Sequence, residues 1–351
     1  MGRSVSESLI AARTGFQDEL IAWYDAHQRP LPWRARPSLY QTIVSEFMLQ
    51  QTQVKTVLPY FARWMEELPD LPALAAADEA RVLKLGEGLG YYTRARNLHR
   101  LARRLVTLRQ PPSTPEEWAE LPGIGPYTAA AITSITYGAS AACIDGNVVR
   151  ILARLTADGT PHRDSAAASR AFAPLAQALL PTARPGDHNQ AMMELGATVC
   201  LRRAPRCTIC PVRRHCAAVQ TGDPETFPRL AAKVMERQTI TRIWSERGDS
   251  LLLHRASAGA RRLASLLELP SREGVGLTEA AVAEASVIAT KRRSITRFLI
   301  TETIVRFDMA DEALRAMAEE MVWVPFDRLD EVTLSGPHRR WVREILAGRG
   351  R

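Results

Sequence analysis

The pattern of hydrophobic and polar positions changes character near residue 216. Few stretches before this point alternate between apolar and polar residues, so the pattern indicates helices rather than strands. Ser4 and Glu7 fit a capping box at the start of the first helix. Short breaks that contain Pro or Gly separate the predicted helices, which cover residues 4–26, 39–65, 78–84, 94–108, 115–120, 127–137, 147–155, 165–179 and 188–199.

The pattern after residue 216 predicts a second unit of mixed α+β structure. A polar, Pro-bearing segment at 221–228 precedes it. We expect a turn at 246–249, a helix at 311–320, and strands at 239–245, 250–254, 294–301, 304–307 and 321–324. The predicted organisation is a helical domain over 1–217, a linker over 218–235 and an α+β domain over 236–351.

Composition adds a charge bias to this picture. The chain of 351 residues has a net charge of +8, and only four of its 46 basic residues are Lys. Arg binds phosphate through a planar fork, so this bias favours a polyanionic partner, although a biased genomic composition explains it equally well. The apolar stretch 128–144 is too short and too polar to predict a membrane span. Without a secretory or lipidation motif, we expect a cytoplasmic, nucleoid-associated protein with no membrane partner.

Four of the five cysteines are gathered in one short segment. Cys200, Cys207, Cys210 and Cys216 have the spacing C-x6-C-x2-C-x5-C. In a reducing compartment such clustering favours metal ligation over disulfides. Four thiolates suit zinc or an iron–sulfur cluster, and the spacing alone does not choose between them. Unligated thiols are the third alternative. Cys143 stands apart and is expected to be a small buried residue.

A tight turn between two predicted helices is the first candidate for chemistry. Residues 121–125 read Leu-Pro-Gly-Ile-Gly, and Gly123 and Gly125 let the backbone turn sharply and expose its N–H groups. With the positive end of the next helix, these groups can hold one DNA phosphate without reading the sequence. An ordinary turn is the competing explanation. Asp145 follows 22 residues after Gly123, ahead of Asn147, and is expected on a loop that enters a helix.

The turn and the carboxylate together resemble the helix-hairpin-helix superfamily of DNA base-excision glycosylases. In the branch similar to endonuclease III, a Lys two residues after the second Gly attacks the sugar and cuts the strand. Tyr127 occupies this position here, and Tyr cannot form a Schiff base with an aldehyde. The resemblance therefore implies a monofunctional glycosylase with no efficient lyase step.

A second carboxylate lies in the run Ser-Glu-Phe-Met-Leu-Gln-Gln-Thr-Gln-Val at 45–54. On a helix, Glu46, Gln50 and Gln53 fall on adjoining turns. A Glu beside Met and Leu is partly desolvated, which raises its pKa and lets it hold a proton near neutrality. A solvated Glu on a helix surface is the plain alternative.

This run closely resembles a signature of the MutY-type adenine DNA glycosylases. Three other segments resemble the same family. Several matches in the same order along the chain are more specific than any single match. They are Leu31-Pro-Trp-Arg34, Gly-Leu-Gly-Tyr-Tyr-Thr-Arg-Ala-Arg-Asn at 88–97, and Asn-Gln-Ala-Met-Met-Glu-Leu-Gly at 189–196.

The resemblance implies a role for each matched residue. Glu46 is expected to protonate N7 of a flipped adenine. Asp145 is expected to stabilise the oxocarbenium-like sugar, with transient covalent capture as a variant. Tyr127 and Asn147 are expected to hold Asp145 and the intermediate, and Glu194 to lie in the polar shell around the base. Breaking an N-glycosidic bond needs one acid and one ionised carboxylate, as in glycosidases.

Base flipping adds a set of expected DNA contacts, because the extrahelical base leaves a gap in the duplex. Tyr91 and Gln51 match the family's wedge and probing positions. An aromatic turn packed on the core is the alternative for 88–92. The other expected DNA-binding residues are Arg34, Leu49, Thr52, Gly123 and Gly125.

The cysteine spacing matches that of the [4Fe-4S] cluster of the endonuclease III and MutY-type enzymes. The resemblance therefore implies such a cluster in the loop 200–216, with the four clustered cysteines as ligands. Five Arg residues in this loop form either a phosphate clamp or ordinary solvated charges: Arg202, Arg203, Arg206, Arg213 and Arg214.

The C-terminal part departs from the family pattern. MutY-type enzymes carry a C-terminal Nudix-like domain that recognises 8-oxoguanine. Residues 236–351 resemble that domain in their position in the chain and in their α+β sequence pattern. No acidic Nudix hydrolase box is present, so we expect no metal-dependent pyrophosphatase activity. The family's Phe-Ser-His recognition tip falls on Ile295-Thr296-Arg297, and Arg cannot reproduce a neutral His. Thr296 and Arg297 stay the expected contacts, with drift and changed specificity both open, and the basic run 291–293 indicates that DNA contact persists.

The sequence thus predicts an all-α helix-hairpin-helix glycosylase core with an iron–sulfur cluster loop, followed by a C-terminal α+β Nudix-like domain. As a monomer on double-stranded DNA, it is expected to remove adenine mispaired with 8-oxoguanine or guanine. One alternative is a glycosylase with a different base or mismatch partner. Another is a non-catalytic, cluster-bearing DNA-binding protein. Tyr127 disfavours the third, a glycosylase with lyase activity.

Overall fold

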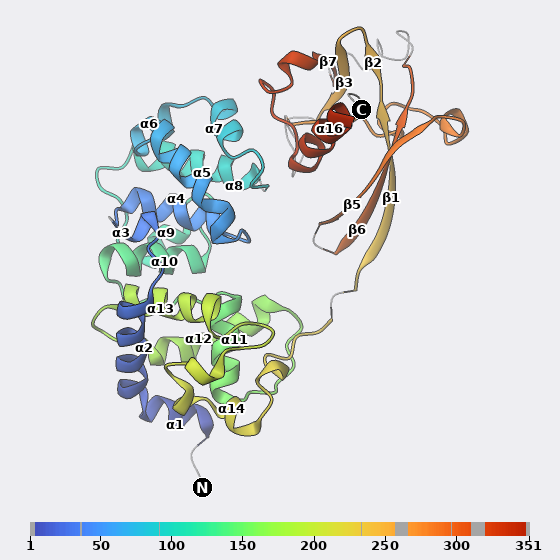
Figure 1. Ribbon diagram of the computed structural model, residues 1–351. Helices are drawn as coiled ribbons and strands as arrows, with labels where there is room; N and C mark the ends of the chain where they lie inside the picture. Colours follow the sequence, from blue (N-terminus) through green and yellow to red (C-terminus); the bar gives the residue numbers. More distant parts are fainter. Residues whose placement is uncertain are drawn as a thin grey trace. The chain divides into compact units, whose positions relative to one another are not determined.

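The computed structural model describes residues 4–35, 37–90, 92–232, 234–256, 266–295, 297–309 and 320–348 (Figure 1). The chain divides into two compact units. The first unit consists of Met1–Gln51 and Leu101–Ala232, and the second of Thr52–Arg100 and Lys233–Arg351. None of the described helices combines the length and the apolar character needed to cross a lipid bilayer.

The first unit is built from helices. Apolar side chains of α1, α2 and α11 to α14 form its main core, and α13 contacts α2, α10 and α11 (Figure 1). No strand occurs among the described residues before 216, which confirms the all-α prediction for this part. The elements are α1 (Val5–Ala11), α2 (Arg13–His27), α3 (Pro32–Ala35), α4 (Leu39–Leu49), α9 (Pro115–Ala119), α10 (Pro126–Tyr137), α11 (Gly146–Thr156), α12 (Ser165–Leu179), α13 (Pro185–Thr198), η1 (Cys207–Ile209), η2 (Arg213–His215), α14 (Ala217–Thr221) and η3 (Pro224–Thr226).

The N-terminal capping box is confirmed. The Ser4 hydroxyl accepts a hydrogen bond from the Glu7 amide at 3.2 Å, and the Glu7 carboxylate accepts one from the Ser4 amide at 2.7 Å. The single helix predicted over 4–26 is wrong, because Ala12 ends α1 and precedes α2.

The single helix predicted over 39–65 is also wrong. Helix α4 ends at Leu49, and α5 (Val54–Glu67) begins only at Val54. Gln51 lies between them with a left-handed φ of 58°, a conformation that a right-handed helix does not contain. Glu46 therefore shares its helix with neither Gln50 nor Gln53, contrary to the prediction.

Two glycines let α13 approach its neighbours closely. A Cβ at Gly186 would lie 2.5 Å from the backbone oxygen of Ser134 on α10, and one at Gly196 would lie 2.5 Å from the Cβ of Asn147 on α11. Both distances are below van der Waals contact, so larger residues there would push the helices apart. Helices α10, α11 and α13 are thus held together around the residues discussed below.

The second unit combines helices with two sheets. In one sheet, β6 pairs in parallel with β1 and antiparallel with β5; in the other, β3 pairs antiparallel with β2, β4 and β7 (Figure 1). The elements are α5, α6 (Leu71–Ala76), α7 (Glu79–Leu85), α8 (Tyr92–Leu105) as far as Arg100, β1 (Glu236–Trp244), β2 (Glu246–Arg247), β3 (Ser250–Arg255), β4 (Leu267–Glu268), η4 (Ala280–Val282), β5 (Val287–Ile295), β6 (Phe298–Arg306), β7 (Met321–Pro325), η5 (Phe326–Arg328) and α16 (Gly336–Gly348).

Several C-terminal predictions need correction. The strand predicted over 294–301 is wrong, because β5 ends at Ile295 and β6 begins at Phe298, so the chain turns back inside that range. The observed turn is shorter than the predicted turn at 246–249, because Glu246 and Arg247 form β2 and pair with β3. Helix α16 was not predicted at all. The predicted helix over 311–320 lies outside the described residues except for Glu320.

A buried ionic cluster fixes the β5–β6 hairpin inside this unit. Glu302 on β6 has no solvent exposure, and its carboxylate accepts hydrogen bonds from Arg242 on β1 at 2.6 Å and from Arg293 on β5. Burial alone raises the pKa of Glu302, but His338 and the two guanidinium groups outweigh it and lower the pKa to about 2. The ionised carboxylate thereby links β1, β5 and β6 to α16.

Candidate active site

Glu46 lies near the end of α4, among buried apolar residues, and is only 7% exposed. Burial raises the pKa of Glu46 to about 7. The negative charge of Asp145 adds to this rise, while a hydrogen bond with Tyr127 and the positive charge of Arg34 oppose it. The raised pKa expected from the sequence is therefore present, and a substantial fraction of the carboxyl groups carries a proton at neutral pH.

Tyr127 is the second residue of α10 and brings a phenol to this carboxyl. Its hydroxyl donates to the Met193 sulfur at 3.4 Å and lies close enough to the Glu46 carboxyl for each group to shift the pKa of the other. Burial and the nearby charges of Glu46 and Asp145 raise the pKa of Tyr127 well above its usual value, so the phenol stays neutral. The structure pairs this hydroxyl with Glu46, whereas the sequence predicted that it holds Asp145.

Asp145 is the N-cap of α11. Its Oδ1 accepts hydrogen bonds from the amides of Asn147 and Val148, both at 2.8 Å, and its Oδ2 accepts one from the Asn147 side chain at 2.9 Å. Three N–H donors at the N-terminus of a helix therefore face this carboxylate. Asn147 holds Asp145, as predicted. Since the charge of Asp145 acts on Glu46, the two carboxyl groups belong to one site.

Arg150, which was not singled out in the sequence, supports Asn147 from the next turn of α11. Its Nη2 donates to the Asn147 side-chain oxygen at 2.9 Å and to the Gly196 carbonyl at 2.8 Å. Its Nε donates to the Cys200 carbonyl at 2.8 Å. A chain of hydrogen bonds therefore runs from Asp145 to the start of the cysteine loop. The only sequence signal for it is the three-residue spacing of Asn147 and Arg150 on a helix.

Because Asn147 lies directly against Gly196, we expect a Gly196→Ala variant to damage both stability and activity. The added methyl group must displace Asn147, at a cost of about 1–3 kcal/mol in the free energy of unfolding, and the Asp145 carboxylate loses one donor. Thermal unfolding and single-turnover excision test this. Gly159→Ala is the control, because its Cβ meets only ordinary contacts at 3.7 Å or more. Equal behaviour of the two variants would contradict the prediction.

Glu194 on α13 forms a second ionic group next to the first. It is fully buried, and its carboxylate pairs with Arg29 Nε at 2.5 Å and with Arg34 Nη2 at 3.0 Å. Burial raises the pKa of Glu194, but the hydrogen bonds and charges of both arginines outweigh it, so the net pKa is lowered. Arg34 also acts on Glu46, so Glu194 and Arg34 lie in the same site. Arg29 was not predicted as a site residue from the sequence. Its position two residues before the Leu31-Pro-Trp-Arg34 motif was the signal that could have identified it.

The predicted hairpin joins α9 to α10. Gly123 has a φ of 77°, which favours glycine at this position. Ile124 is buried, and Gly125 is the N-cap of α10, followed by Pro126. The turn therefore presents the N-terminus of α10 with the geometry that anions prefer.

The candidate DNA-contact residues at the probing and wedge positions are only partly described. Leu49 ends α4 and Gln51 is exposed in the turn that follows. In the second unit, the Thr52 hydroxyl accepts a hydrogen bond from Arg94 at 3.2 Å. Tyr91 lies outside the described residues, and so does Thr296. Arg297, in the β5–β6 turn, pairs with Glu236 at 3.0 Å and lies over the Phe298 ring.

The basic run 291–293 is largely committed to contacts within its own unit. Lys291 pairs with Glu344 at 2.6 Å, and Arg293 pairs with the buried Glu302. The expected DNA contact of this run therefore rests chiefly on the exposed Arg292.

Two of the four clustered cysteines, Cys200 and Cys216, contact Arg154 near the end of α11. The pKa of Cys210 is raised to about 12 by burial, with contributions from the charges of Cys200, Cys207 and Cys216. The four thiols are thus near enough to influence one another. Among the described residues, no three His, Cys, Asp or Glu side chains are arranged to hold a single metal ion.

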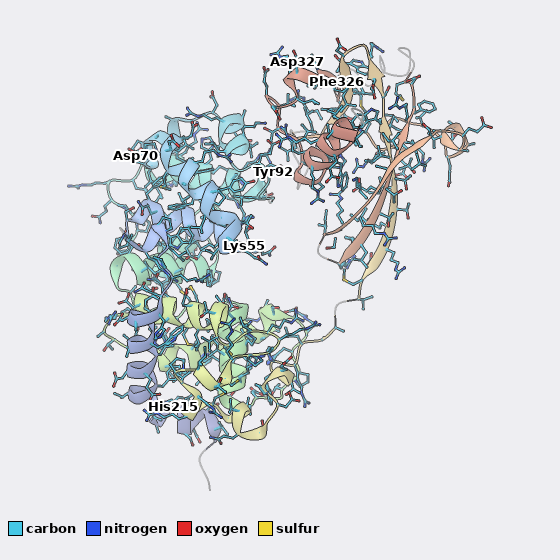
Figure 2. All side chains as sticks on the ribbon, in the orientation of Figure 1. Lys55, Asp70, Tyr92, His215, Phe326 and Asp327 are labelled. Atoms are coloured by element: carbon cyan, nitrogen blue, oxygen red, sulfur yellow. The ribbon has the colours of Figure 1, made fainter. Side chains whose placement is uncertain are left out.

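Arg154 is the residue that both ends of this loop contact. It is 2% exposed, and its Nη1 donates to the Cys200 sulfur at 3.3 Å. The Cys216 thiol donates to the Arg154 carbonyl at 3.4 Å. Within the loop, His215 hydrogen-bonds Glu19 of α2 at 3.1 Å (Figure 2). The five arginines of the loop are all exposed.

Comparisons with known proteins agree with this geometry. The profile of the HhH-GPD superfamily of base excision DNA repair proteins matches residues 44–174, which include Glu46, Tyr127 and Asp145. Among solved structures, a thermostable thymine-DNA glycosylase aligns with a TM-score of 0.52 at 23% identity, covering 60% of this chain and 98% of that one. An endonuclease III in a non-covalent DNA complex aligns with a TM-score of 0.51 at 19% identity, covering 61% and 97%. These likenesses establish the fold of the helical part.

Sequence relatives narrow the assignment further. The chain is 45% identical to the human adenine DNA glycosylase over 227 residues, which cover 62% of this chain and 41% of that protein. The rat enzyme is 46% identical, covering 60% and 43%. The chain thus spans less than half the length of these two relatives. The adenine DNA glycosylase of Mycolicibacterium smegmatis is 42% identical over 210 residues, covering 59% of this chain and 70% of that protein. On this similarity, with a site built around Glu46 and Asp145, the chain belongs to the adenine DNA glycosylase family of helix-hairpin-helix repair proteins.

Proposed function

We propose that the protein removes mispaired adenine from duplex DNA and leaves an abasic site. The observation that carries this proposal is the pairing of two unlike carboxyl groups in one site. Glu46 is buried with a pKa of about 7, whereas Asp145 accepts three N–H hydrogen bonds at a helix N-terminus. Cleavage of an N-glycosidic bond needs this division of labour between an acid and an anion.

In the proposed reaction, the target adenine is flipped out of the duplex and Glu46 donates its proton to N7. The bond between N9 and C1′ then breaks, and its electron pair leaves with the base. The positive charge that develops on the sugar is stabilised by the Asp145 carboxylate. Water adds to C1′ and its proton returns to Glu46, so the enzyme is regenerated. Asn147 holds Asp145, and the Tyr127 phenol positions Glu46.

The same site supports monofunctional action. A lyase step needs an amine that forms a Schiff base with the sugar aldehyde. Tyr127 supplies a neutral phenol at the position where such an amine would act. We therefore propose that the product keeps an intact strand.

The rate of excision is expected to fall as pH rises above about 7. Only the protonated form of Glu46 can donate, and its raised pKa is about 7, so each further pH unit should reduce the single-turnover rate about tenfold. The hydrogen bond from Tyr127 lowers this pKa, so a Tyr127→Phe variant should move the fall to higher pH. Quenched single-turnover assays between pH 6 and 9 measure both effects. A rate that stays constant to pH 9 would contradict the assignment.

We infer that the four clustered cysteines hold a [4Fe-4S] cluster. The buried cation Arg154 donates to the Cys200 sulfur, and a positive charge there suits a set of thiolates. The charges of Cys200, Cys207 and Cys216 all act on Cys210, so the four thiols lie near one another, and four thiolates are the usual ligands of such a cluster. When bound, the cluster would fasten the ends of the arginine-bearing loop, and no step of base excision depends on it.

For the C-terminal residues 236–351 we propose a Nudix-like domain that recognises the base opposite adenine. Its two sheets and α16 are compatible with that architecture. Arg297 at the β5–β6 turn is the exposed candidate for phosphate or guanine contact. Because this tip carries Arg rather than a neutral His, an altered opposite-base preference is the second candidate function.

A panel of duplexes tests the proposal. It should contain adenine opposite 8-oxoguanine, guanine and cytosine, and thymine or uracil opposite guanine. Half of each reaction is heated in alkali, which cuts abasic strands, and half is left untreated. We expect alkali-dependent cleavage of the adenine mispairs. Failure to cleave any adenine-containing duplex would overturn the adenine assignment, and cleavage without alkali would overturn monofunctional action.

A further inference from the structure

The segment between α7 and α8 is fastened at its start by Glu87. One oxygen of this carboxylate accepts hydrogen bonds from Arg339 Nη2 and from the Leu334 amide, both at 2.9 Å. The other accepts from Lys84 at 2.9 Å. Glu87 belongs to the helical stretch of the second unit, whereas Leu334 and Arg339 belong to the C-terminal stretch of the same unit. The side chains of Glu87 and Arg339 are only 12% and 10% exposed, so solvent screens this pair less than a surface pair.

The segment is fastened again at its end by Tyr92, the first residue of α8 (Figure 2). The Tyr92 hydroxyl donates to the Leu334 carbonyl at 2.7 Å. Its ring packs with Leu83 and Leu266 in a small apolar cluster. The Leu334 carbonyl therefore accepts a hydrogen bond from Tyr92, and the Leu334 amide donates one to Glu87.

Arg339 is also bound to its own stretch of chain. Its guanidinium donates to the Leu329 carbonyl and to Asp330, both at 2.8 Å, and to the Val332 carbonyl. The single planar guanidinium of Arg339 therefore links the Glu87 carboxylate to the turn at 329–334.

Residues 88–90, which follow Glu87, have a constrained backbone. Gly88 and Gly90 have φ values of 96° and 70°, and a Cβ at Gly88 would lie 2.2 Å from the Tyr60 hydroxyl. The carbonyls of Leu89 and Gly90 accept hydrogen bonds from Arg94 at 3.3 and 3.4 Å. Arg94 also bonds Thr52, so both expected DNA-probing segments meet at this side chain.

We propose that Glu87 is a positioning residue for base extrusion, through which Arg339 of the C-terminal stretch holds residues 86–90 in their working shape. The inference rests on the proposed function, because it assumes that this segment takes part in flipping adenine. Glu87 itself touches neither the base nor the sugar. Its effect should therefore appear in the extrusion step and in discrimination between opposite bases, while the chemistry at Glu46 is unchanged.

The test uses the full chain and a duplex with 2-aminopurine at the target position opposite 8-oxoguanine, whose fluorescence rises when the base leaves the stack. Glu87→Ala should slow this rise roughly tenfold, as for the loss of a coupled charged contact. Glu87→Gln keeps one acceptor oxygen and should recover part of the rate. The pH at which single-turnover excision falls should stay at its wild-type value in both variants. Glu67→Ala is the matched control, because it breaks the exposed pair with Arg81 in the same unit.

A double-mutant cycle separates positioning from general destabilisation. Because Glu87 acts through Arg339, the combined Glu87→Ala and Arg339→Gln variant should extrude the base no more slowly than the slower single variant. Additive losses, or a wild-type fluorescence rise in Glu87→Ala, would overturn the inference. A failure of the wild-type protein to excise adenine would instead overturn the proposed function, so the two failures are distinguishable.

Discussion

A Glu46→Gln variant is expected to excise adenine ~10²–10⁴ times more slowly than the wild-type protein, the usual contribution of a general acid. Gln has nearly the same shape as a protonated Glu but cannot give up a proton at neutral pH. Tyr127 can still donate a hydrogen bond to the amide oxygen, so the helices around the site keep their packing. Single-turnover excision from a duplex with adenine opposite 8-oxoguanine measures the effect.

The same variant should be as stable as the wild type or more stable at high pH. A carboxyl whose pKa rises from 4.5 to about 7 on folding contributes stability that is fully present below pH 4.5, and this contribution is lost as the pH rises from 4.5 through 7. Gln has no such dependence, so the melting temperature of the variant should rise relative to that of the wild type between about pH 5 and 8 and then stay level. Glu66→Gln, at an exposed position, is the control. A fully active Glu46→Gln protein would remove Glu46 from the mechanism.

The second large effect is expected from Asp145→Asn. Asn is as good an N-cap as Asp, so α11 should form normally, but the negative charge opposite the developing cation is lost. Removing one preorganised electrostatic partner typically costs ~10²–10³ in rate. Excision should fall by that factor, while the binding of mispaired DNA stays close to that of the wild type.

Asp164→Asn provides the matched control for this variant. Asp164 is also the N-cap of its helix, α12, where its carboxylate accepts from the Ala167 amide at 2.8 Å, and it has no part in the proposed chemistry. Only Asp145→Asn should slow excision by ~10²–10³, whereas Asp164→Asn should excise adenine at the wild-type rate. Equal activities of the two variants would show that Asp145 is a helix cap and nothing more.

Local patterns predicted much of the helical fold. Helix α12 has the predicted bounds, and the capping box at Ser4 and the hairpin at 121–125 form as expected, because caps and glycine turns act over a few residues. The break after α4 was missed because Gln51 adopts a left-handed φ that residue type alone does not predict. Helix α16 had a usable signal, the apolar spacing of Trp341, Val342, Ile345 and Leu346.

Only those residues of the candidate site that belong to a sequence motif could be predicted. Sequence motifs identify Glu46 and Asp145 as candidates. Only the structure shows that the charge of Asp145 acts on Glu46. Arg29 and Arg150 were missed, because their value depends on partners more than 40 residues away in the chain, Glu194 and Gly196. Such pairings join residues far apart in the chain, so the local sequence does not reveal the partner.

The central claim is that Glu46 holds a proton at neutral pH beside an anionic Asp145. The most direct measurement is the infrared difference spectrum between the wild-type protein and Glu46→Gln, followed as a function of pH. The account predicts a carboxylic acid band in the wild type that disappears with a midpoint near pH 7. A carboxyl group that is already ionised at pH 6, with a midpoint near 4.5, would contradict it.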